Sequence, residues 1–260
     1  MSVVRTHPQA RLAADLAADL AADLAADLAL ESDLWGAGYR VIAGIDEAGR
    51  GAWAGPVVAA AVILPTNADA LALLLGQVDD SKRLTPATRE RLFDVIQAHA
   101  LSVGVGFRLA GEIDHVGILL ATIQAMSQAV AYLEPPPDFL LIDYLTLPHL
   151  PHAQRGIPHG DGLSLSIAAA SIIAKVTRDR WMVSQDASYT GYGFAQHKGY
   201  GTAQHREALR RLGPCALHRC TFRPVAEMAT GGNDYVPGSK PAAQIGIAVR
   251  KTDRSVPFGH

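Results

Sequence analysis

The sequence predicts a protein of the α/β class, with a mixed central sheet flanked by helices. Short apolar segments, several of them β-branched, alternate with longer segments whose apolar residues recur at helical spacing. The first two strand segments follow each other across a glycine-rich turn, whereas helices separate the later ones, and this combination indicates a mixed sheet. Apolar residues make up 49% of the 260 residues, enough for a buried core.

Composition limits the function classes. Two cysteines cannot supply a disulfide framework, no secretory signal precedes the first apolar segment, and no apolar run reaches the ~20 residues that span a bilayer. We therefore expect a soluble, cytoplasmic protein. A net charge of −2 gives no overall sign of nucleic-acid binding, but it sums unlike regions, since residues 1–40 alone hold three basic residues and six acids.

Residues 1–36 are predicted to be an acidic extension of a domain that spans residues 37–228. Residues 12–31 repeat Leu-Ala-Ala-Asp, and alanine and leucine favour helix. A four-residue period advances the leucine stripe by about 40° per repeat, so the stripe winds around the helix. We interpret the repeat as a solvated, marginal helix, with a partner-binding helix as the alternative. Residues 229–260 are predicted to be a loosely ordered tail.

The first half of the domain holds three predicted strands. Residues 41–46 and 55–64 predict two antiparallel strands, and residues 101–109 alternate well enough for a third. Between them, Thr85 is a candidate N-cap with Pro86 at the first helical position, which predicts a helix to about His99.

The second half is predicted to be mainly helical. A helix over residues 113–133 ends at three prolines, and residues 138–143 (DFLLID) predict a buried strand that ends in a carboxylate. Residues 147–162 predict a loop, and residues 163–183 a long helix with small residues on one side. Residues 191–200 predict a second loop, followed by a short basic helix over residues 203–212.

Four carboxylates stand out by position. Asp46 and Glu47 end the first predicted strand, Asp143 ends the DFLLID strand, and Asp161 lies in a Gly-Asp-Gly turn before the long helix. Ligands gather at strand ends in open sheets. Adjacent strand residues point to opposite faces, so Asp46 and Glu47 can share a metal only where the strand ends or bulges. The turn that follows, Gly49-Arg50-Gly51, permits this; we call it the glycine turn.

These acids suit a hard cation. With no cysteine or histidine at ligand spacing, carboxylates favour Mg²⁺ or Mn²⁺ over Zn²⁺. Two such ions ~4 Å apart can activate a water and stabilise the leaving oxygen of a phosphodiester. A turn or helix-cap role is the alternative for each acid, and Asp161 is a good cap candidate. Spacing alone leaves both interpretations open.

The motifs around these acids resemble those of bacterial ribonuclease HII. The resemblance starts at residues 45–51 (IDEAGRG) and covers about residues 40–225 in family order. The further blocks are residues 55–61 (GPVVAAA), 80–82 (DSK), 140–143 (LLID), 160–161 (GD), 169–179 (AASIIAKVTRD), 197–202 (HKGYGT) and 218–222 (HRCTF). Together these blocks are very specific, whereas the repeat and the tail lie outside them.

The resemblance implies a ribonuclease H-like fold with a C-terminal helical region. It implies an endonuclease that hydrolyses the RNA strand of RNA–DNA hybrids and nicks duplex DNA 5′ of single embedded ribonucleotides. The products would carry 3′-hydroxyl and 5′-phosphate ends, and the cofactor would be Mn²⁺ or Mg²⁺. The partners would be such hybrids and ribonucleotide-containing DNA rather than a membrane. The protein would act as a monomer in removing ribonucleotides from DNA.

The resemblance also implies roles for single residues. By motif position, the catalytic, metal-binding acids are Asp46, Glu47, Asp143 and Asp161. Gly49, Arg50 and Gly51 match the motif that contacts the 2′-hydroxyl and its flanking phosphate, and Tyr200 matches the tyrosine that packs against the next sugar.

Physical chemistry supports these roles. The 2′-hydroxyl is what separates RNA from DNA at a sugar, and glycines let a backbone approach it closely. Arg50 supplies a cation near phosphate, and the flat ring of Tyr200 can sense a ribose-to-deoxyribose junction by shape. The alternatives are a surface turn arginine and a loop aromatic that covers the core.

Other basic residues can contact phosphates without reading sequence. They are Lys82, Lys175, Lys198, Arg206, Arg210 and Arg211. A solvated surface charge is the alternative for each. Cys215, His218 and Cys220 match no common zinc spacing, so free thiols are expected.

Four residues depart from the family pattern: Ala52, Trp53, Tyr144 and His159. His159 stands where lysine is common and Tyr144 where glycine is common, whereas Trp53 either covers the nucleic-acid edge or packs inside. The acids are intact, so we expect metal-assisted phosphodiester hydrolysis. Competing hypotheses are a non-catalytic nucleic-acid-binding module of the same fold and a carboxylate-pair glycosidase, which would not need a cation.

Overall fold

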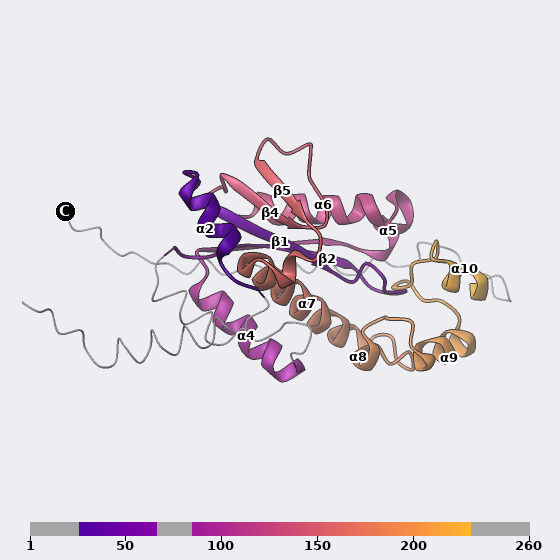
Figure 1. The fold of residues 1–260 in the computed structure, drawn as a ribbon. Coiled ribbons are helices and arrows are strands. Elements are labelled where there is room, and N and C mark those ends of the chain that lie inside the picture. Colours follow the sequence, from indigo (N-terminus) through magenta and orange to yellow (C-terminus); the bar gives the residue numbers. More distant parts are fainter. Residues whose placement is uncertain (1–25, 67–84, 230–260) are drawn as a thin grey trace, which may run out of the picture.

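A five-stranded mixed sheet organises the protein, whose computed structural model describes residues 26–66 and 85–229 (Figure 1). Its strands are β1 Ile42–Ala48, β2 Val57–Ile63, β3 Ser102–Arg108, β4 Phe139–Asp143 and β5 Ala153–Ile157. The order is β3-β2-β1-β4-β5. β2 is antiparallel to β1 and β3, whereas β4 is parallel to β1 and β5. The predicted mixed sheet is confirmed.

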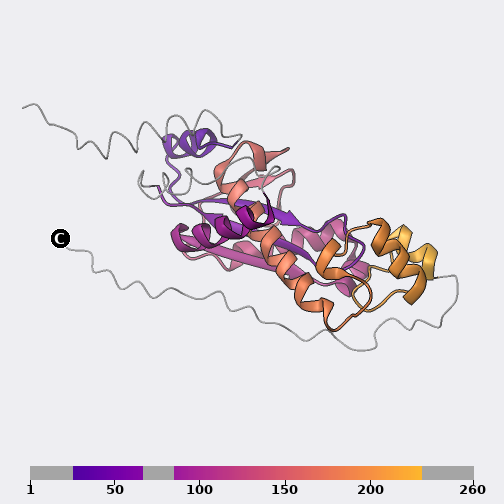
Figure 2. The same cartoon turned by 90° about the horizontal axis from the view of Figure 1, so that it is seen from below.

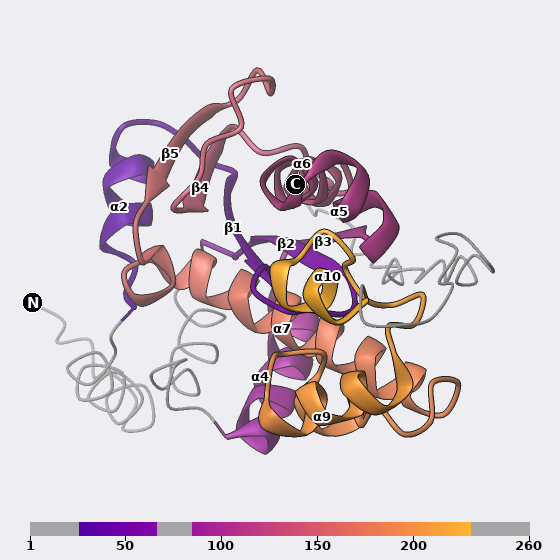
Figure 3. The same cartoon turned by 90° about the vertical axis from the view of Figure 1, so that its right-hand side faces the viewer.

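Helices cover both faces of this sheet. α5 (Ala110–Val116) and α6 (Ile118–Ala131) lie on one side, and α4 (Pro86–His99) and α7 (Leu165–Asp186) lie on the other (Figure 3). Successive residues of β1 face opposite sides of the sheet, each of which has its own hydrophobic core. Ala43 and Ile45 pack under α6, while Gly44 meets α7. A Cβ atom on Gly44 would come within 2.0 Å of the Ser166 carbonyl carbon. α7 therefore lies directly on the strand that carries the first two acids.

Several elements lie where the sequence predicts them. The Thr85 side chain accepts a hydrogen bond from the Thr88 amide at 3.2 Å, and α4 begins at Pro86 and ends at His99. The short basic helix is α9 (Ala203–Leu212). Together with α8 (Phe194–His197) and α10 (Arg223–Ala229), α9 forms the expected C-terminal helical region at one end of the molecule (Figure 2).

Several predicted boundaries are wrong. The helix predicted over residues 113–133 is two helices, because Gly117 between α5 and α6 has φ 81° and ψ 155°, which no helix contains. The predicted loop over residues 147–162 holds β5, an edge strand whose side chains are largely exposed, so its sequence lacks an apolar signal. α7 ends at Asp186 rather than residue 183.

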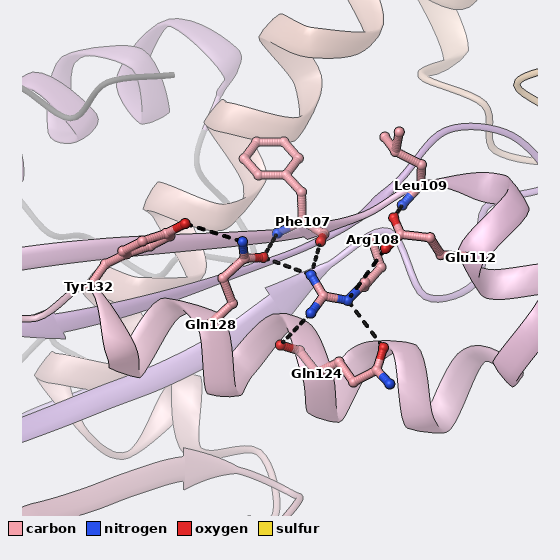
Figure 4. A network of polar contacts seen from close by, with 7 residues as sticks. All are labelled: Phe107, Arg108, Leu109, Glu112, Gln124, Gln128 and Tyr132. Atoms are coloured by element: carbon pink, nitrogen blue, oxygen red, sulfur yellow. Dashed lines mark hydrogen bonds and ion pairs between the residues drawn. The ribbon is translucent and has the colours of Figure 1, made fainter. Parts of the chain in front are cut away.

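The other edge strand, β3, is tied to α6 through polar side chains (Figure 4). The Gln128 side chain accepts hydrogen bonds from the Phe107 amide at 3.0 Å and from Arg108 Nη1 at 2.7 Å. Arg108 Nε donates to Gln124 Oε1 at 3.1 Å. These bonds occupy groups that an edge strand would otherwise offer to another chain.

Residues 26–36 correct the prediction of a solvated extension. They include α2 (Ala29–Gly36), and Glu31 on this helix is 2% exposed. One Glu31 carboxylate oxygen accepts bonds from Ser164 Oγ at 2.6 Å and from the Ser166 amide at 3.0 Å. This carboxylate satisfies donors in the first turn of α7, which explains its burial. Residues 1–25 of the repeat and the predicted tail after Ala229 lie outside the described residues.

Within the described ranges, no helix has the length and apolar character needed to cross a membrane.

Candidate active site

Asp46 and Asp143 lie side by side on neighbouring parallel strands. The register pairs Ile45 of β1 with Ile142 of β4, so the next residue on each strand is an aspartate. Asp46 is 6% exposed and shares a hydrogen bond with the side chain of Ser171 on α7. Asp143 Oδ1 accepts a bond from the Gly160 amide at 2.7 Å. The sheet therefore gathers these two predicted acids under α7.

Burial and neighbouring charge oppose ionisation of Asp46. Its pKa is raised well above the ordinary value, first by desolvation and then by the negative charges of Glu47 and Asp143. The pKa of Glu47 is also raised by burial, while Arg50 acts in the opposite direction. Asp46, Glu47 and Asp143 thus lie close enough together for their negative charges to act on one another.

Glu47 does not lie where the strand ends. β1 continues to Ala48, with Glu47 still paired to Ala59 of β2, so the expectation that the strand stops at Asp46 is wrong. The Glu47 side chain is 11% exposed, and its Oε1 meets Arg50 Nη1 at 3.2 Å. Its Oε2 is buried, with no hydrogen-bond partner in the described part of the chain.

Asp161 lies on η1 (Gly160–Gly162), the short 3₁₀ helix that leads into α7. It does not cap α7, because the Ser164 side chain accepts from the Ile167 amide at 3.3 Å and is the N-cap. In the part of the chain that the structure describes, no three His, Cys, Asp or Glu side chains are already arranged to hold a metal ion.

Two buried arginines support the glycine turn from below. Gly49 has φ 94°, and a Cβ atom there would come within 2.0 Å of Arg178 Nε, so only glycine fits. Arg219 Nη1 donates to the Arg50 carbonyl at 2.9 Å. Because the carbonyl and amide of one peptide point in opposite directions, this bond turns the Gly51 amide away from Arg219. Gly51 is exposed, and beyond its chain neighbours no atom lies within 4 Å of the place that a Cβ atom would take.

Tyr200 lies in the loop of residues 197–202, which we call the tyrosine loop. Its carbonyl is 3.0 Å from Nδ1 of His205, and His205 Nε2 is 3.1 Å from His218 Nε2. The Cys215 amide donates to His218 Nδ1 at 2.9 Å. This network assigns a proton to Nε2 of His218 and to Nδ1 of His205, so both rings are neutral donors in one chain.

The family follows from comparison with known proteins. A family model described as Ribonuclease HII matches residues 43–225. The chain belongs to the ribonuclease HII family. A ribonuclease HII from Pelobacter propionicus is 60% identical over 193 residues, which are 74% of this chain and 86% of that protein. One from Geobacter sulfurreducens is 59% identical over 190 residues, 73% of this chain and 85% of that protein.

A solved structure agrees with this assignment. The ribonuclease H2 of Pyrococcus horikoshii OT3 is 25% identical, with a TM-score of 0.62 over 74% of this chain and 98% of that one. The predicted ribonuclease H-like fold is confirmed, and the protein is an endonuclease of the ribonuclease H type.

The lysines predicted to contact phosphates differ in the partners that they have in the structure. Lys175 pairs with Asp179 at 2.9 Å and also lies 5.1 Å from the centre of the Tyr200 ring. The Lys198 ammonium bonds to carbonyl groups of the preceding helix α8, at Ala195 and Gln196. Lys82 lies outside the described residues.

Trp53 is half-buried and packs against the tyrosine loop. Its amide donates to the Gly199 carbonyl at 2.8 Å, and its ring occupies the place that a Cβ on Gly201 would need, 2.3 Å away. The Arg206 guanidinium lies 5.6 Å from the ring centre. Trp53 therefore joins the segment after the glycine turn to the tyrosine loop, which the sequence left open.

Sequence reasoning missed the structural importance of Arg178, Arg219 and Ser171. All three lie in family blocks, residues 169–179 and 218–222, but a charged residue is ordinarily solvated, and no periodicity marked these as buried. Cys215 and Cys220 are free thiols, as predicted.

Tyr144 carries backbone strain beside the candidate acids. It follows Asp143, has φ 60° and is 65% exposed. A bulky side chain in this region costs on the order of 1–3 kcal/mol, whereas glycine adopts it freely. Glycine, the common residue at this place in the resemblance, therefore fits the backbone better than tyrosine.

We expect Tyr144→Gly to raise the free energy of unfolding by about 1 kcal/mol, because relief of strain exceeds the small loss of buried area. Urea unfolding measures it. Tyr132→Gly is the matched control, since Tyr132 is 61% exposed but has φ −91°, and it should lose stability. A less stable Tyr144→Gly protein would show that the tyrosine ring contributes more than its strained backbone costs.

Proposed function

We propose that this ribonuclease HII cuts the RNA strand of RNA–DNA hybrids and nicks duplex DNA 5′ of single ribonucleotides, leaving 3′-hydroxyl and 5′-phosphate ends. The observation that carries the proposal is the adjacency of buried carboxylates and the glycine turn. Asp46 and Glu47 precede the turn by two to three residues, on a strand flanked by Asp143. Cutting chemistry and sugar recognition can then act on one nucleotide.

We propose that the acids hold Mn²⁺ or Mg²⁺. The residues fit a divalent cation, because Glu47 Oε2 is a buried acceptor without a partner among the described residues, and the pKa of Asp46 is raised by burial and by nearby negative charge. A bound cation would give the Glu47 oxygen a partner and would offset the negative charge around Asp46. Asp46, Glu47 and Asp143 would provide the ligands, with Asp161 reaching in from η1. When bound, the metal supplies an activated water and stabilises the leaving 3′-oxygen.

The chain's own groups would select the sugar. The Gly51 amide is turned outward by the bond between Arg219 and the Arg50 carbonyl, which suits donation to a 2′-hydroxyl. Arg50 is 37% exposed, and its side chain can pair with the flanking phosphate once Glu47 turns to the metal. The Tyr200 ring would pack against the following deoxyribose. Lys82, Lys175 and Lys198 would contact phosphates and position the duplex.

We further propose that residues 37–228 form the catalytic unit, with residues 26–36 packed on it, and that the protein acts as a monomer in the cytoplasm. Duplex binding would then need no second copy of the chain.

A nicking assay tests the function. A labelled duplex with one ribonucleotide is incubated with the protein and Mn²⁺ or Mg²⁺, beside an all-DNA duplex and a long hybrid. We expect nicks 5′ of the ribonucleotide, ends that a polymerase extends, an intact all-DNA control and full inhibition by EDTA. Binding without any nick would support the non-catalytic module instead, and EDTA-insensitive cleavage would contradict a metal mechanism.

A further inference from the structure

Two arginines in the centre of the candidate site are completely buried. Arg178 on α7 and Arg219 near the C-terminal helices are each 0% exposed. Arg178 Nη1 and Arg219 Nη2 have no hydrogen-bond partner among the residues that the structure describes. Burying a guanidinium is costly, so the bonds that these side chains do make must offset that cost.

The arginine bonds converge on the segment that starts at the glycine turn. Arg178 donates to the carbonyls of Pro56 at 2.9 Å and Ala54 at 3.0 Å. Arg219 donates to the carbonyls of Gly55 at 3.0 Å and Arg50 at 2.9 Å. Four carbonyls within seven residues are thus fixed by two planar cations, which hold the turn in one conformation.

Arg178 also contacts the second recognition element. Its guanidinium carbon lies 5.1 Å from the centre of the Tyr200 ring. Its Nε lies 2.0 Å from where a Gly49 side chain would begin. One side chain therefore contacts both the glycine turn and the tyrosine, so its position bears on the distance between them.

The backbone of Tyr200 is held independently. His205 donates to the Tyr200 carbonyl at 3.0 Å, and His218 supports His205 from behind. With the backbone fixed by histidine, the ring position depends on what it rests against, namely Arg178 and Lys175.

We propose that Arg178 is a positioning residue that fixes the spacing between the glycine turn and the Tyr200 ring, so that a 2′-hydroxyl and the adjoining deoxyribose are read together. This inference rests on the proposed function. Lysine cannot replace arginine here, because an ammonium has neither the flat face that stacks on a ring nor two donors in a fixed fork.

The test is Arg178→Lys, assayed on a duplex with one ribonucleotide and on a long RNA–DNA hybrid. Both substrates need the glycine turn, but only the first presents a deoxyribose to Tyr200. We expect kcat/KM on the single ribonucleotide to fall by at least about 10-fold more than on the hybrid. Arg180→Lys is the matched control, since Arg180 lies on the same helix, is half exposed and pairs with Glu90, so the substrate ratio should not change.

A double-mutant cycle tests the coupling. Tyr200→Leu should lower kcat/KM on the single ribonucleotide relative to the hybrid by a similar factor, which we call the loss of substrate preference. The double variant should lose no more of this preference than either single variant. Equal losses on both substrates, or additive losses of preference in the cycle, would overturn the inference. If Arg178→Lys melts below the assay temperature, Arg178→Gln is tested instead. If Tyr200→Leu keeps the wild-type ratio of kcat/KM on the two substrates, the inference is overturned whatever the Arg178 variants show.

Failure of the proposed function has a different signature. If the wild-type protein nicks no ribonucleotide substrate, the function itself is wrong. If the wild-type protein nicks normally but the Arg178 variants keep the wild-type ratio of kcat/KM on the two substrates, the proposed function is supported and the proposed role of Arg178 is wrong.

Discussion

Asp46→Asn is expected to abolish cleavage while making the metal-free protein more stable. Loss of one metal-binding acid should lower the rate by more than ~10²-fold, or about 2.7 kcal/mol of transition-state stabilisation. The pKa of Asp46 is raised in the folded protein by burial and by Glu47 and Asp143, so above the ordinary pKa of an aspartate this group lowers the stability of the folded state. Asparagine has a similar shape and no charge, and thus removes that cost.

Three measurements check this prediction. Thermal unfolding in EDTA should show a higher Tm for Asp46→Asn, by about 2–4 °C for each kcal/mol relieved. Added Mn²⁺ should raise the Tm of the wild type but not of the variant. Binding of the duplex, measured by anisotropy, should persist. Asp94→Asn is the control, because Asp94 is an exposed acid on α4 that should change neither rate nor Tm.

Near wild-type cleavage by Asp46→Asn in Mn²⁺ would sink the assignment of the metal site, as would the same result for Asp143→Asn. A lower Tm in EDTA would instead show that the Asp46 carboxylate is stabilised by its bonds more than it is destabilised by burial.

Acidification is expected to unfold the C-terminal helical region first, because two of its histidines are buried and neutral. Burial lowers the pKa of His205 to about 4 and that of His218 to about 3. In the unfolded chain both have ordinary values near 6.5, so below that pH the unfolded state binds protons that the folded state does not. Stability is therefore full above about pH 6.5 and is lost as the pH falls toward 4.

The expected loss is about 3–5 kcal/mol between pH 6.5 and 4.5, since each group contributes up to ~1.4 kcal/mol per pH unit. Urea unfolding at stepped pH measures it. Asp46 and Glu47 act in the opposite direction, because their raised pKa values favour the folded state as protons are added. The histidine contribution must therefore be isolated with a variant.

His205→Asn isolates that contribution. The asparagine amide can still donate toward the Tyr200 carbonyl but does not titrate, so the variant should be less stable than wild type at pH 7.5 and approach it as pH falls. His115→Asn, at an exposed position on α5, is the control and should leave the pH dependence unchanged. A parallel pH profile for wild type and His205→Asn would contradict the prediction.

Local sequence predicted most elements because their signals are local. β1, β2, α4 and α9 follow from β-branched runs, the Thr85 cap, Pro86 and basic helical spacing, and all lie close to the predicted positions. The misses have physical reasons as well. Gly117 divides a continuous apolar pattern by its φ angle, and β5 is a polar edge strand that pairs on one side only.

The candidate site was likewise predicted in part from the sequence and decided in part by the structure. Motif positions brought Asp46, Glu47, Asp143 and Asp161 to attention, and the sheet register places Asp46 beside Asp143. The structure also turns Glu47 to Arg50 and makes Ser164, rather than Asp161, the cap of α7. Neither choice is visible in spacing, because each depends on which partner lies nearest in space.

The sequence by itself determined the family, the mixed sheet, the candidate acids and the glycine turn, because these depend on residue type and order along the chain. Only the tertiary structure decided what lies beneath the turn. Arg178 and Arg219 come from segments far from it in sequence, and both are completely buried although charged residues are ordinarily solvated. Their burial is possible because backbone carbonyls of residues 50–56 accept their N–H groups, and that requires three distant segments to meet.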